Sequence, residues 1–501
     1  MNDNLLGIDL GSGGCKVTLL NLKNKIAKTY SKEYTTYYPA PGWAEQNSFD
    51  WINSAAILVR KALIENDCDP KSVLAVGLSG VTHSPVLMDK NMEVIERVMH
   101  ITDSRSFKQS EKLKKEYGEE ILKKCLNPVG PMWTISMLAW VKESDKNKWD
   151  DIRKIIFPKD YLRFVLTGNI ATDYIDAQGT LLFNPIAKEW EEDFVKILGL
   201  NKSCFPDILK PTDIAGKINK RGKELTGLKE GTPVITGTTD TLLEILAAGN
   251  LQPGSCTAKL ATFGRICVLT DKPFSGEGII NYSYIIPGLW YPGTGTKSFA
   301  SSFRWIRDEL CKDISKQKDA FLIMDEEAKL IPAGSEGLIF HPYLVGEGSP
   351  YNDPHLRGDF LGINLHHTRA HLIRAVLEGT SFSMLDCLDF IKSKGIQING
   401  QIKFIGGGSN SNLWTAILAD VFGEDAVIPA NTDASFGAAM LAGAGAGFYK
   451  TIEEAVKENS TIKKKINFNM KNNEVYKKIF KIYKNSKQAL TEINQDISLM
   501  L

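Results

Sequence analysis

Several features of specialised proteins are missing from this sequence of 501 residues. No run of about 18 uninterrupted apolar residues occurs, which argues against a membrane-spanning helix. No basic segment followed by an apolar one opens the chain, so we expect a cytoplasmic protein. The eight cysteines are scattered singly, without a C-x-x-C pair or Cys/His ligand spacing. This scatter favours reduced thiols over a disulfide framework.

A strong net charge is also missing. The 60 basic and 59 acidic residues leave a formal charge of +1, which gives no electrostatic reason to expect nucleic acid or an anionic membrane as partner. The composition, 43% hydrophobic and 24% charged, is that of an ordinary globular protein. The length exceeds what one hydrophobic core fills, so we expect two domains, a cleft between them, and small-molecule chemistry in the cleft.

Glycines are concentrated near the start, in LLGIDLGSGGCKVTLLNL. Residues 5–10 and 15–22 alternate as strands, and only residues 11–14 separate them, which predicts a hairpin. A dinucleotide fingerprint and a P-loop both need a helix after the glycines, so neither fits here. Glycines without side chains let backbone N–H groups bind phosphate, although an ordinary tight turn has the same composition.

Further segments show periodicity typical of an α/β protein. A second strand-turn-strand segment lies about 250 residues after the first and indicates an internal duplication. The expected elements are a helix within 43–64 with Ser48 or Asp50 as N-cap, strands over 72–80, 93–102 and 232–240, helical stretches up to 162–168, a hairpin over 256–270, a strand, glycine turn and helix over 401–423, a small-residue helix over 434–448, and a lysine-rich helical tail after about residue 450.

Two motifs resemble those of the FGGY sugar kinases, within the actin/hexokinase superfamily. GIDLGSGGCK is similar to the family's first phosphate motif, and GDFLGINLHHTRAHLIRAVLE (358–378) fits the second family signature. The resemblance implies an α/β fold of two actin-like ATPase (ribonuclease H-like) domains with an interdomain cleft. We place the domains at 1–247 and 248–501. The implied cofactors are ATP and Mg²⁺.

Among family members the xylulokinases are the most similar in pattern. GLSGVTH (77–83) and TDSR (102–105) resemble their sugar loops, but Val81, Thr82, Thr241 and the segment LATFG (260–264) depart from the pattern, and the first family signature is only partial in PMWTISMLAWVKE. The expected activity is phosphoryl transfer from Mg·ATP to an open-chain sugar, D-xylulose first. Alternatives are a kinase of another ketose, a polyol or gluconate, and a catalytically silent regulator that binds sugar or nucleotide. Homodimer formation is left open.

Asp240 is the expected general base, because it follows the apolar strand TPVIT where open α/β sheets expose their ligands. Capping the next helix is its structural alternative. Asp9 is the expected Mg²⁺ site, Lys16 could reach phosphate or face solvent, and Asp103 with Arg105 could instead form a local ion pair. The residues expected to bind sugar are Thr82, His83, Asp103, Arg105 and Thr241. The residues expected to bind ATP are Gly11, Ser12, Gly13, Gly14, Lys16, Thr262, Gly264, Gly407, Gly408, Ser411 and Asn412.

Overall fold

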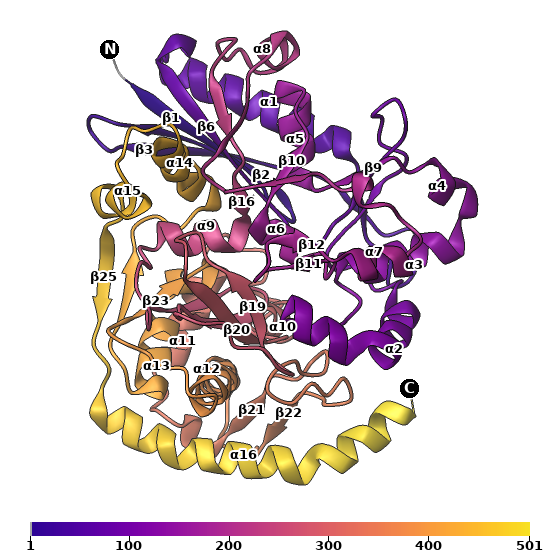
Figure 1. Cartoon of the computed structure of the whole chain (residues 1–501). Helices are drawn as coiled ribbons and strands as arrows, with labels where there is room; N and C mark the ends of the chain where they lie inside the picture. The colour runs from indigo at the N-terminus through magenta and orange to yellow at the C-terminus, as the bar shows by residue number, and fades with distance from the viewer. Residues whose placement is uncertain (1–2, 501) are drawn as a thin grey trace.

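The computed structural model describes residues 3–500. Two seven-stranded sheets organise it, one from each half of the chain (Figure 1). The first sheet contains β1 (Asn4–Leu10), β2 (Gly14–Asn21), β3 (Ala27–Glu33), β6 (Val73–Gly80), β14 (Ile214–Lys217), β15 (Pro233–Ile235) and β16 (Thr238–Thr239). The second contains β17 (Cys256–Leu260), β18 (Gly264–Val268), β19 (Ile280–Ser283), β20 (Trp290–Thr296), β23 (Ile402–Ile405), β24 (Ala426–Pro429) and β25 (Ile462–Ile466).

The two sheets repeat one topology. β1 pairs antiparallel with β2 and parallel with β6, and β17 pairs in the same ways with β18 and β23. The outer strands also correspond, because β3 and β20 pair antiparallel with the second hairpin strand, and β14 and β25 are antiparallel edge strands. This correspondence confirms the predicted duplication and the predicted fold of two actin-like α/β domains.

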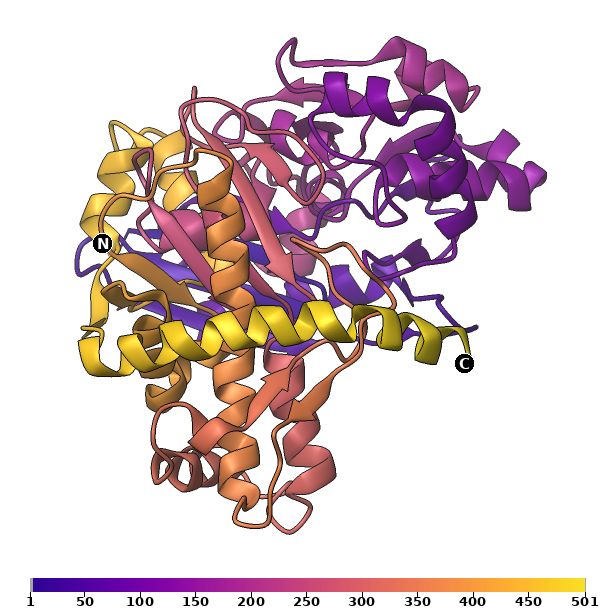
Figure 2. The same cartoon turned by 90° about the horizontal axis from the view of Figure 1, so that it is seen from below.

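Helices cover the sheets, and the longest, α16, runs along the outside of the C-terminal half (Figures 1 and 2). No helix within residues 3–500 is long and apolar enough to cross a membrane. The helices are α1 (Ser48–Glu65), α2 (Phe107–Cys125), α3 (Thr134–Ser144), α4 (Lys146–Asp151), α5 (Pro158–Thr167), α6 (Tyr174–Gln178), α7 (Glu192–Ile197), α8 (Lys220–Thr226), α9 (Asp240–Ala247), α10 (Ala300–Leu310), α11 (Ala320–Lys329), α12 (Arg369–Ser393), α13 (Asn412–Phe422), α14 (Ala434–Gly445), α15 (Ile452–Asn459) and α16 (Met470–Leu499).

Short strands in the connecting segments form small sheets of two or three strands. They are β4 (Thr36–Tyr37), β5 (Glu45–Gln46), β7 (Val86–Met88), β8 (Val98–Met99), β9 (Lys154–Ile156), β10 (Ala171–Asp173), β11 (Phe183–Asn184), β12 (Glu189–Trp190), β13 (Asp207–Leu209), β21 (Ile339–His341) and β22 (Asp359–Leu361).

The small-residue helix α14 joins the two halves. In sequence it lies between β24 and β25 of the second sheet, but it packs on β1 and β6 of the first, beside α9. A Cβ at Gly7 would lie 1.8 Å from the Ser435 carbonyl oxygen, and one at Gly77 would lie 1.9 Å from that of Ala438. Only glycine permits this approach of helix to sheet. The domain boundary that we propose near residue 247 therefore separates the two sheets, but it does not separate the helices that cover them.

Four local expectations need correction. The tail expected to be helical after about residue 450 contains the strand β25 between α15 and α16. Asn47 caps α1 by accepting from the Phe49 N–H, while Ser48 and Asp50 lie inside the helix. Of the strand expected over 93–102 only β8 forms in full, because the rest of that alternating segment has no partner strand beyond one isolated bridge. The strand expected over 232–240 is broken at Gly237, whose φ of 73° favours glycine and ends β15 before β16 begins.

Candidate active site

Three neighbouring parallel strands end at one place in the first sheet. Asp9 of β1 lies in register with Ser79 of β6, and Thr239 of β16 lies in register with Gly80. Asp240 follows as the first residue of α9. Because parallel strands expose ligand-binding groups at their carboxyl ends, this edge brings the two aspartates that the sequence singled out to one site.

Asp9 is a buried carboxylate with an unfavourable electrostatic environment. Its side chain accepts a hydrogen bond from Ser79 Oγ at 2.6 Å, and the residue is 6% exposed. Burial, together with the negative charges of Asp240 and Glu244, raises the pKa of Asp9 from 3.8 to about 7. A cation bound here would relieve both the burial and the repulsion. The donor set of carboxylates therefore fits a hydrated Mg²⁺.

The carbonyl groups of the first hairpin turn are held by side chains. The Tyr34 hydroxyl donates to the Gly11 carbonyl oxygen. Gln46 Nε2 donates to the Ser12 carbonyl oxygen at 2.7 Å, and His100 Nε2 lies 3.2 Å from the same oxygen. These three contacts hold the Gly11 and Ser12 carbonyl groups against neighbouring side chains of the protein. The N–H groups of Ser12 and Gly13 are therefore available to bind another partner.

The N–H groups of Ser12 and Gly13 donate no hydrogen bond within residues 3–500. A Cβ added at Gly13 would meet no atom within 4 Å, so this glycine faces open space. Gly14 differs, because a Cβ there would lie 2.8 Å from the Lys32 carbonyl oxygen of β3. Consecutive free N–H groups at a turn form an anion-binding concavity, and the geometry at residues 12 and 13 fits phosphate.

The Lys16 side chain already has an acidic partner in this structure. Its Nζ forms an ion pair with Asp433, which lies just before α14 and 417 residues away in sequence. The Lys16 side chain remains 45% exposed. Lys16 would therefore have to exchange Asp433 for a phosphate in order to contact a nucleotide.

A cavity of about 650 Å³ opens beside the second hairpin and the late glycine turn. Its lining combines apolar side chains with short polar ones, as purine sites require. The lining residues are Leu260, Ala261, Thr262, Ala300, Phe303, Arg304, Lys318, Asp319, Phe321, Leu322, Asp325, Gly407, Gly408, Asn410, Ser411 and Trp414.

Four of the residues expected to bind ATP, Thr262, Gly407, Gly408 and Ser411, line this cavity. The other two from the same region do not. Asn412 points elsewhere, because its Oδ1 accepts from Lys464 Nζ at 2.6 Å. Gly264 packs inside the protein, where a Cβ would lie 2.5 Å from Met384 Sδ.

Both ring nitrogens of His83 form hydrogen bonds. Nδ1–H donates to the Gly179 carbonyl oxygen at 2.8 Å, and Nε2 accepts from the Tyr282 hydroxyl at 3.1 Å. The Trp133 ring meets the imidazole edge to face at 4.6 Å. Burial lowers the pKa of His83 to about 4, so the ring is neutral near pH 7. His83 thereby connects the sugar-loop segment of the N-terminal half to β19 of the C-terminal half.

Asp103 and Arg105 form the ion pair that the sequence left as one alternative. Arg105 Nε donates to both carboxylate oxygens of Asp103, at 3.0 and 2.9 Å, and the two side chains are 5% and 1% exposed. Asp103 Oδ2 also accepts from the Ala44 N–H, and the Arg105 guanidinium lies over the Trp43 ring at 3.6 Å. The pair stabilises the loop beside the first hairpin.

Asp240 is not the N-cap of α9. Thr239 occupies that position, and Asp240 Oδ1 instead accepts from the Thr241 N–H at 2.6 Å and lies 3.3 Å from Thr241 Oγ1. This arrangement leaves Oδ2 of Asp240 for another partner.

Thr82, in the sugar-loop segment, lies close to Gly179. A Cβ added at Gly179 would lie 2.3 Å from Thr82 Oγ1.

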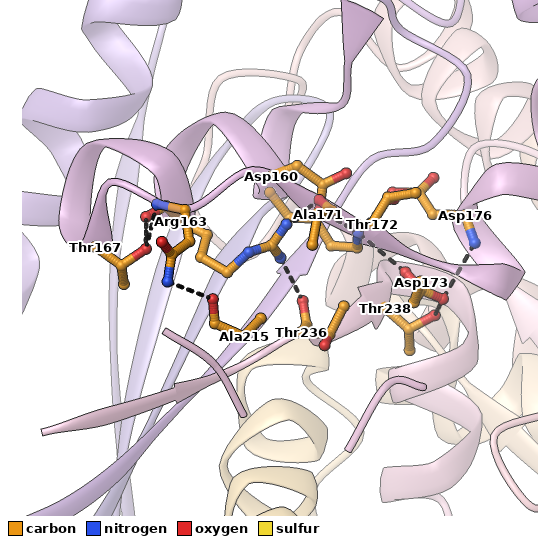
Figure 3. A network of polar contacts seen from close by, with 12 residues as sticks. Asp160, Arg163, Thr167, Ala171, Thr172, Asp173, Asp176, Ala215, Thr236 and Thr238 are labelled. Atoms are coloured by element: carbon orange, nitrogen blue, oxygen red, sulfur yellow. Dashed lines mark hydrogen bonds and ion pairs between the residues drawn. The ribbon is translucent and has the colours of Figure 1, made fainter. Parts of the chain in front are cut away.

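A buried charge network contacts Thr236 and Thr238, in the segment shortly before α9 (Figure 3). Lys159 Nζ lies 2.6, 3.0 and 3.1 Å from carboxylate oxygens of Asp160, Asp173 and Asp176. Arg163 adds an ion pair with Asp160 at 2.9 Å, and all five side chains are fully buried. Buried charges are costly unless they are paired, so these ion pairs favour one arrangement of the five side chains.

Two contacts of the network reach the chain directly ahead of the expected base. Arg163 Nη1 donates to the Thr236 carbonyl oxygen at 2.9 Å, and Thr238 Oγ1 donates to Asp173 Oδ1 at 2.8 Å. They hold the backbone that leads into Asp240. Sequence reasoning did not identify this role, although the charged residues inside the apolar helix KDYLRFVLTG were a visible signal.

Sequence reasoning also missed an ion pair between the two halves. Glu244 lies one helical turn after Asp240 on α9 and pairs with Lys259 of β17. Burial raises the pKa of Glu244, and the Asp240 charge adds to this effect, while Lys259 lowers it. The i, i+4 spacing of Asp240 and Glu244 places both carboxyl groups on one helix face and was the available signal.

Comparisons with known proteins agree with this architecture. The N-terminal domain model of the FGGY family of carbohydrate kinases matches residues 4–247, and the C-terminal domain model matches residues 264–446. Xylulose kinase of Bacillus subtilis is 29% identical over 98% of each chain. Gluconokinase of the same organism is 27% identical over 90% of this chain and 88% of its own. The crystal structure of xylulose kinase from Rhodospirillum rubrum superposes with a TM-score of 0.89 at 25% identity, covering 98% of this chain and 99% of that one. Together with the duplicated fold and the paired glycine turns, these matches show that the chain belongs to the FGGY family of carbohydrate kinases, and is thus an ATP-using phosphotransferase that acts on a sugar.

Proposed function

We propose that this kinase transfers the γ-phosphoryl group of Mg·ATP to a hydroxyl of a small open-chain sugar, with D-xylulose giving D-xylulose 5-phosphate as the first acceptor to test. One observation carries the proposal. Asp9 of β1 is in register with Ser79 of β6, and Asp240 directly follows Thr239, which is in register with Gly80, so both aspartates lie at the same strand ends. The free N–H groups of residues 12 and 13 follow Asp9 in the same hairpin.

The chain's own groups divide the work of binding. The Ser12 and Gly13 N–H groups would hold phosphate oxygens, and the cavity beside Gly407, Gly408 and Ser411 would take the purine. Asp9 would hold Mg²⁺, which supplies charge neutralisation on the phosphates. Thr82, His83, Asp103, Arg105 and Thr241 remain the proposed sugar-binding set.

Asp240 would act as general base through Oδ2, since Oδ1 is engaged by Thr241. It takes the proton of the attacking hydroxyl while the new O–P bond forms and the bond from the γ-phosphorus to the bridging oxygen of ADP breaks. Phosphoryl transfer needs mainly positioning, which the buried Lys159 network supplies by holding Thr236 and Thr238.

Asp240→Asn tests the assignment. Asn is nearly isosteric, keeps the oxygen that accepts from Thr241, and cannot take the proton. We expect kcat to fall by roughly 10² to 10⁴, with the thermal midpoint and the Kd for ATP unchanged. Asp207→Asn, on the exposed part of β13, is the matched control. An Asn variant as active as the wild type would refute the base and move the search to Asp103.

A second acceptor class, an aldonate such as gluconate, is favoured by Arg265. Nη2 of Arg265 is buried without a hydrogen-bond partner, and no carboxylate within residues 3–500 forms an ion pair with this side chain. Its charge contributes to the lowered pKa of His83. An anionic acceptor would supply the missing counter-charge.

Measuring ADP release over D-xylulose, D-ribulose, a polyol and gluconate distinguishes the two classes. If Arg265 binds a carboxylate, Arg265→Met should lower kcat/KM for gluconate and leave that for D-xylulose near wild type. An equal loss for all acceptors would place Arg265 at the transferred phosphoryl group instead. A wild-type protein that turns over no member of the panel would favour the catalytically silent regulator.

A further inference from the structure

Three side chains from separate segments meet on the surface of the C-terminal half. Glu336 precedes β21, His366 follows β22, and His371 lies in the first turn of α12. Nε2 of His366 lies 2.9 Å from Glu336 Oε2, and Nε2 of His371 lies 3.3 Å from the same oxygen. The three ligand atoms all lie within 4.8 Å of one another.

We propose that Glu336, His366 and His371 bind one divalent transition-metal ion of the Zn²⁺ type. Imidazole nitrogens with one carboxylate oxygen are the donors that such ions prefer, whereas Mg²⁺ and Ca²⁺ prefer oxygen alone. A tetrahedral ion with bonds of about 2.0–2.1 Å holds its ligand atoms about 3.3 Å apart. The two contacts to Glu336, at 2.9 and 3.3 Å, are close to this spacing, and the two imidazole nitrogens lie within 4.8 Å of each other.

The surroundings suit neutral imidazole ligands. Each Nε2–H now points at the carboxylate, and metal binding would move that proton to Nδ1 of the same ring. His371 Nδ1 now accepts the Thr368 backbone N–H at 3.1 Å, so metal binding would open that hydrogen bond, and Thr368 Oγ1, 3.0 Å from Nδ1, would accept the relocated N–H. A hydrogen bond from the second ring nitrogen is the usual way in which proteins orient a metal-binding histidine.

The two residues before Glu336 are held in place before any ion arrives. Glu378 of α12 accepts from the Gly334 N–H at 3.0 Å and from Ser335 Oγ at 2.8 Å. The same helix carries His371, so two of the three ligands share one rigid support. Within residues 3–500 no lysine or arginine forms an ion pair with Glu336, which leaves its charge for a cation.

Access and coordination number are also suitable. The His366 side chain is 53% exposed and that of Glu336 is 44% exposed, while His371 is 9% exposed. A fourth position is therefore open to water. His367 lies beside the cluster, with its ring centroid 4.3 Å from that of His366, and its Nε2 is buried without a partner.

None of these residues belongs to the proposed kinase site, so the two proposals fail or succeed separately. The ion would join the loop at 336, the loop at 366 and the start of α12. Because it binds the folded chain, it should stabilise that chain against unfolding.

The test is a Zn²⁺ titration of the tag-free, EDTA-treated full chain against a chromophoric chelator. We expect one ion per chain with a Kd of about 1 µM or below. His366→Ala and Glu336→Gln should each weaken binding at least about tenfold. His355→Ala, which removes a histidine bonded to Ser498, is the matched control and should bind as the wild type does.

A thermal melt with and without one equivalent of Zn²⁺ gives a second readout. The midpoint should rise in the wild type and in His355→Ala, and it should not rise in the two cluster variants. Because His366 is largely exposed, its variant should fold, and the apo melt checks this. Absence of any site tighter than about 100 µM, or equal affinity in wild type and cluster variants, would overturn the proposal.

Discussion

Replacing Asp9 by Asn should stabilise the protein at alkaline pH while abolishing its activity. The raised pKa of about 7 means that the folded chain holds a proton on Asp9 which the unfolded chain, with a value of 3.8, has released. An acid with a raised pKa makes the free energy of unfolding fall as pH rises from about 4 to about 7. Asn is neutral throughout and keeps an oxygen for the Ser79 hydroxyl.

The magnitude follows from the shift. About three pKa units at 1.36 kcal/mol per unit give about 4 kcal/mol. We therefore expect equal stability of wild type and Asp9→Asn near pH 4, and a variant more stable by up to about 4 kcal/mol at pH 8. Part of the difference depends on the charges of Asp240 and Glu244, so Asp240→Asn should reduce it.

Urea unfolding at pH 5, 6, 7 and 8 measures the effect, with Asp207→Asn as the control on exposed β13. Millimolar Mg²⁺ should stabilise the wild type at pH 8 and leave Asp9→Asn unchanged, because the ion needs the carboxylate. A stability difference between wild type and Asp9→Asn that does not vary with pH would refute the reasoning. It would mean that the pKa of Asp9 is the same in the folded and the unfolded chain.

Further predictions concern the turn and the sugar loop. Gly13→Val should raise KM for ATP at least about tenfold with an unchanged melting temperature, because its side chain enters only ligand space; a normal KM would contradict the phosphate role. Gly14→Ala should instead lower the melting temperature, since its Cβ meets the β3 backbone. His83→Ala should raise KM for the acceptor more than for ATP. Because the pKa of His83 is about 4, a plot of acceptor KM against pH should show no inflection between pH 6 and 8. An inflection that disappears in His83→Ala would show that His83 changes its charge in this range.

Local patterns in the sequence were sufficient for the elements that carry the site. Alternating apolar residues around glycine turns predicted both hairpins, and both form as β1–β2 and β17–β18. The strand, glycine turn and helix over 401–423 form as expected, as does the small-residue helix α14. These features depend on backbone freedom and on the period of apolar residues, which are properties of neighbours in the chain.

Contacts between distant residues were decided only by the tertiary structure. The residues next to Asp9 in the sequence do not indicate that its carboxyl group is buried, yet burial is the main cause of its raised pKa. His83 meets Tyr282 across 199 residues, and Lys16 meets Asp433 across 417. The strand expected over 93–102 failed for the same reason, because an alternating segment needs a partner strand to pair with. Desolvation, pairing and charge proximity depend on which segments pack together, and that information lies in the fold and not in any short stretch of the chain.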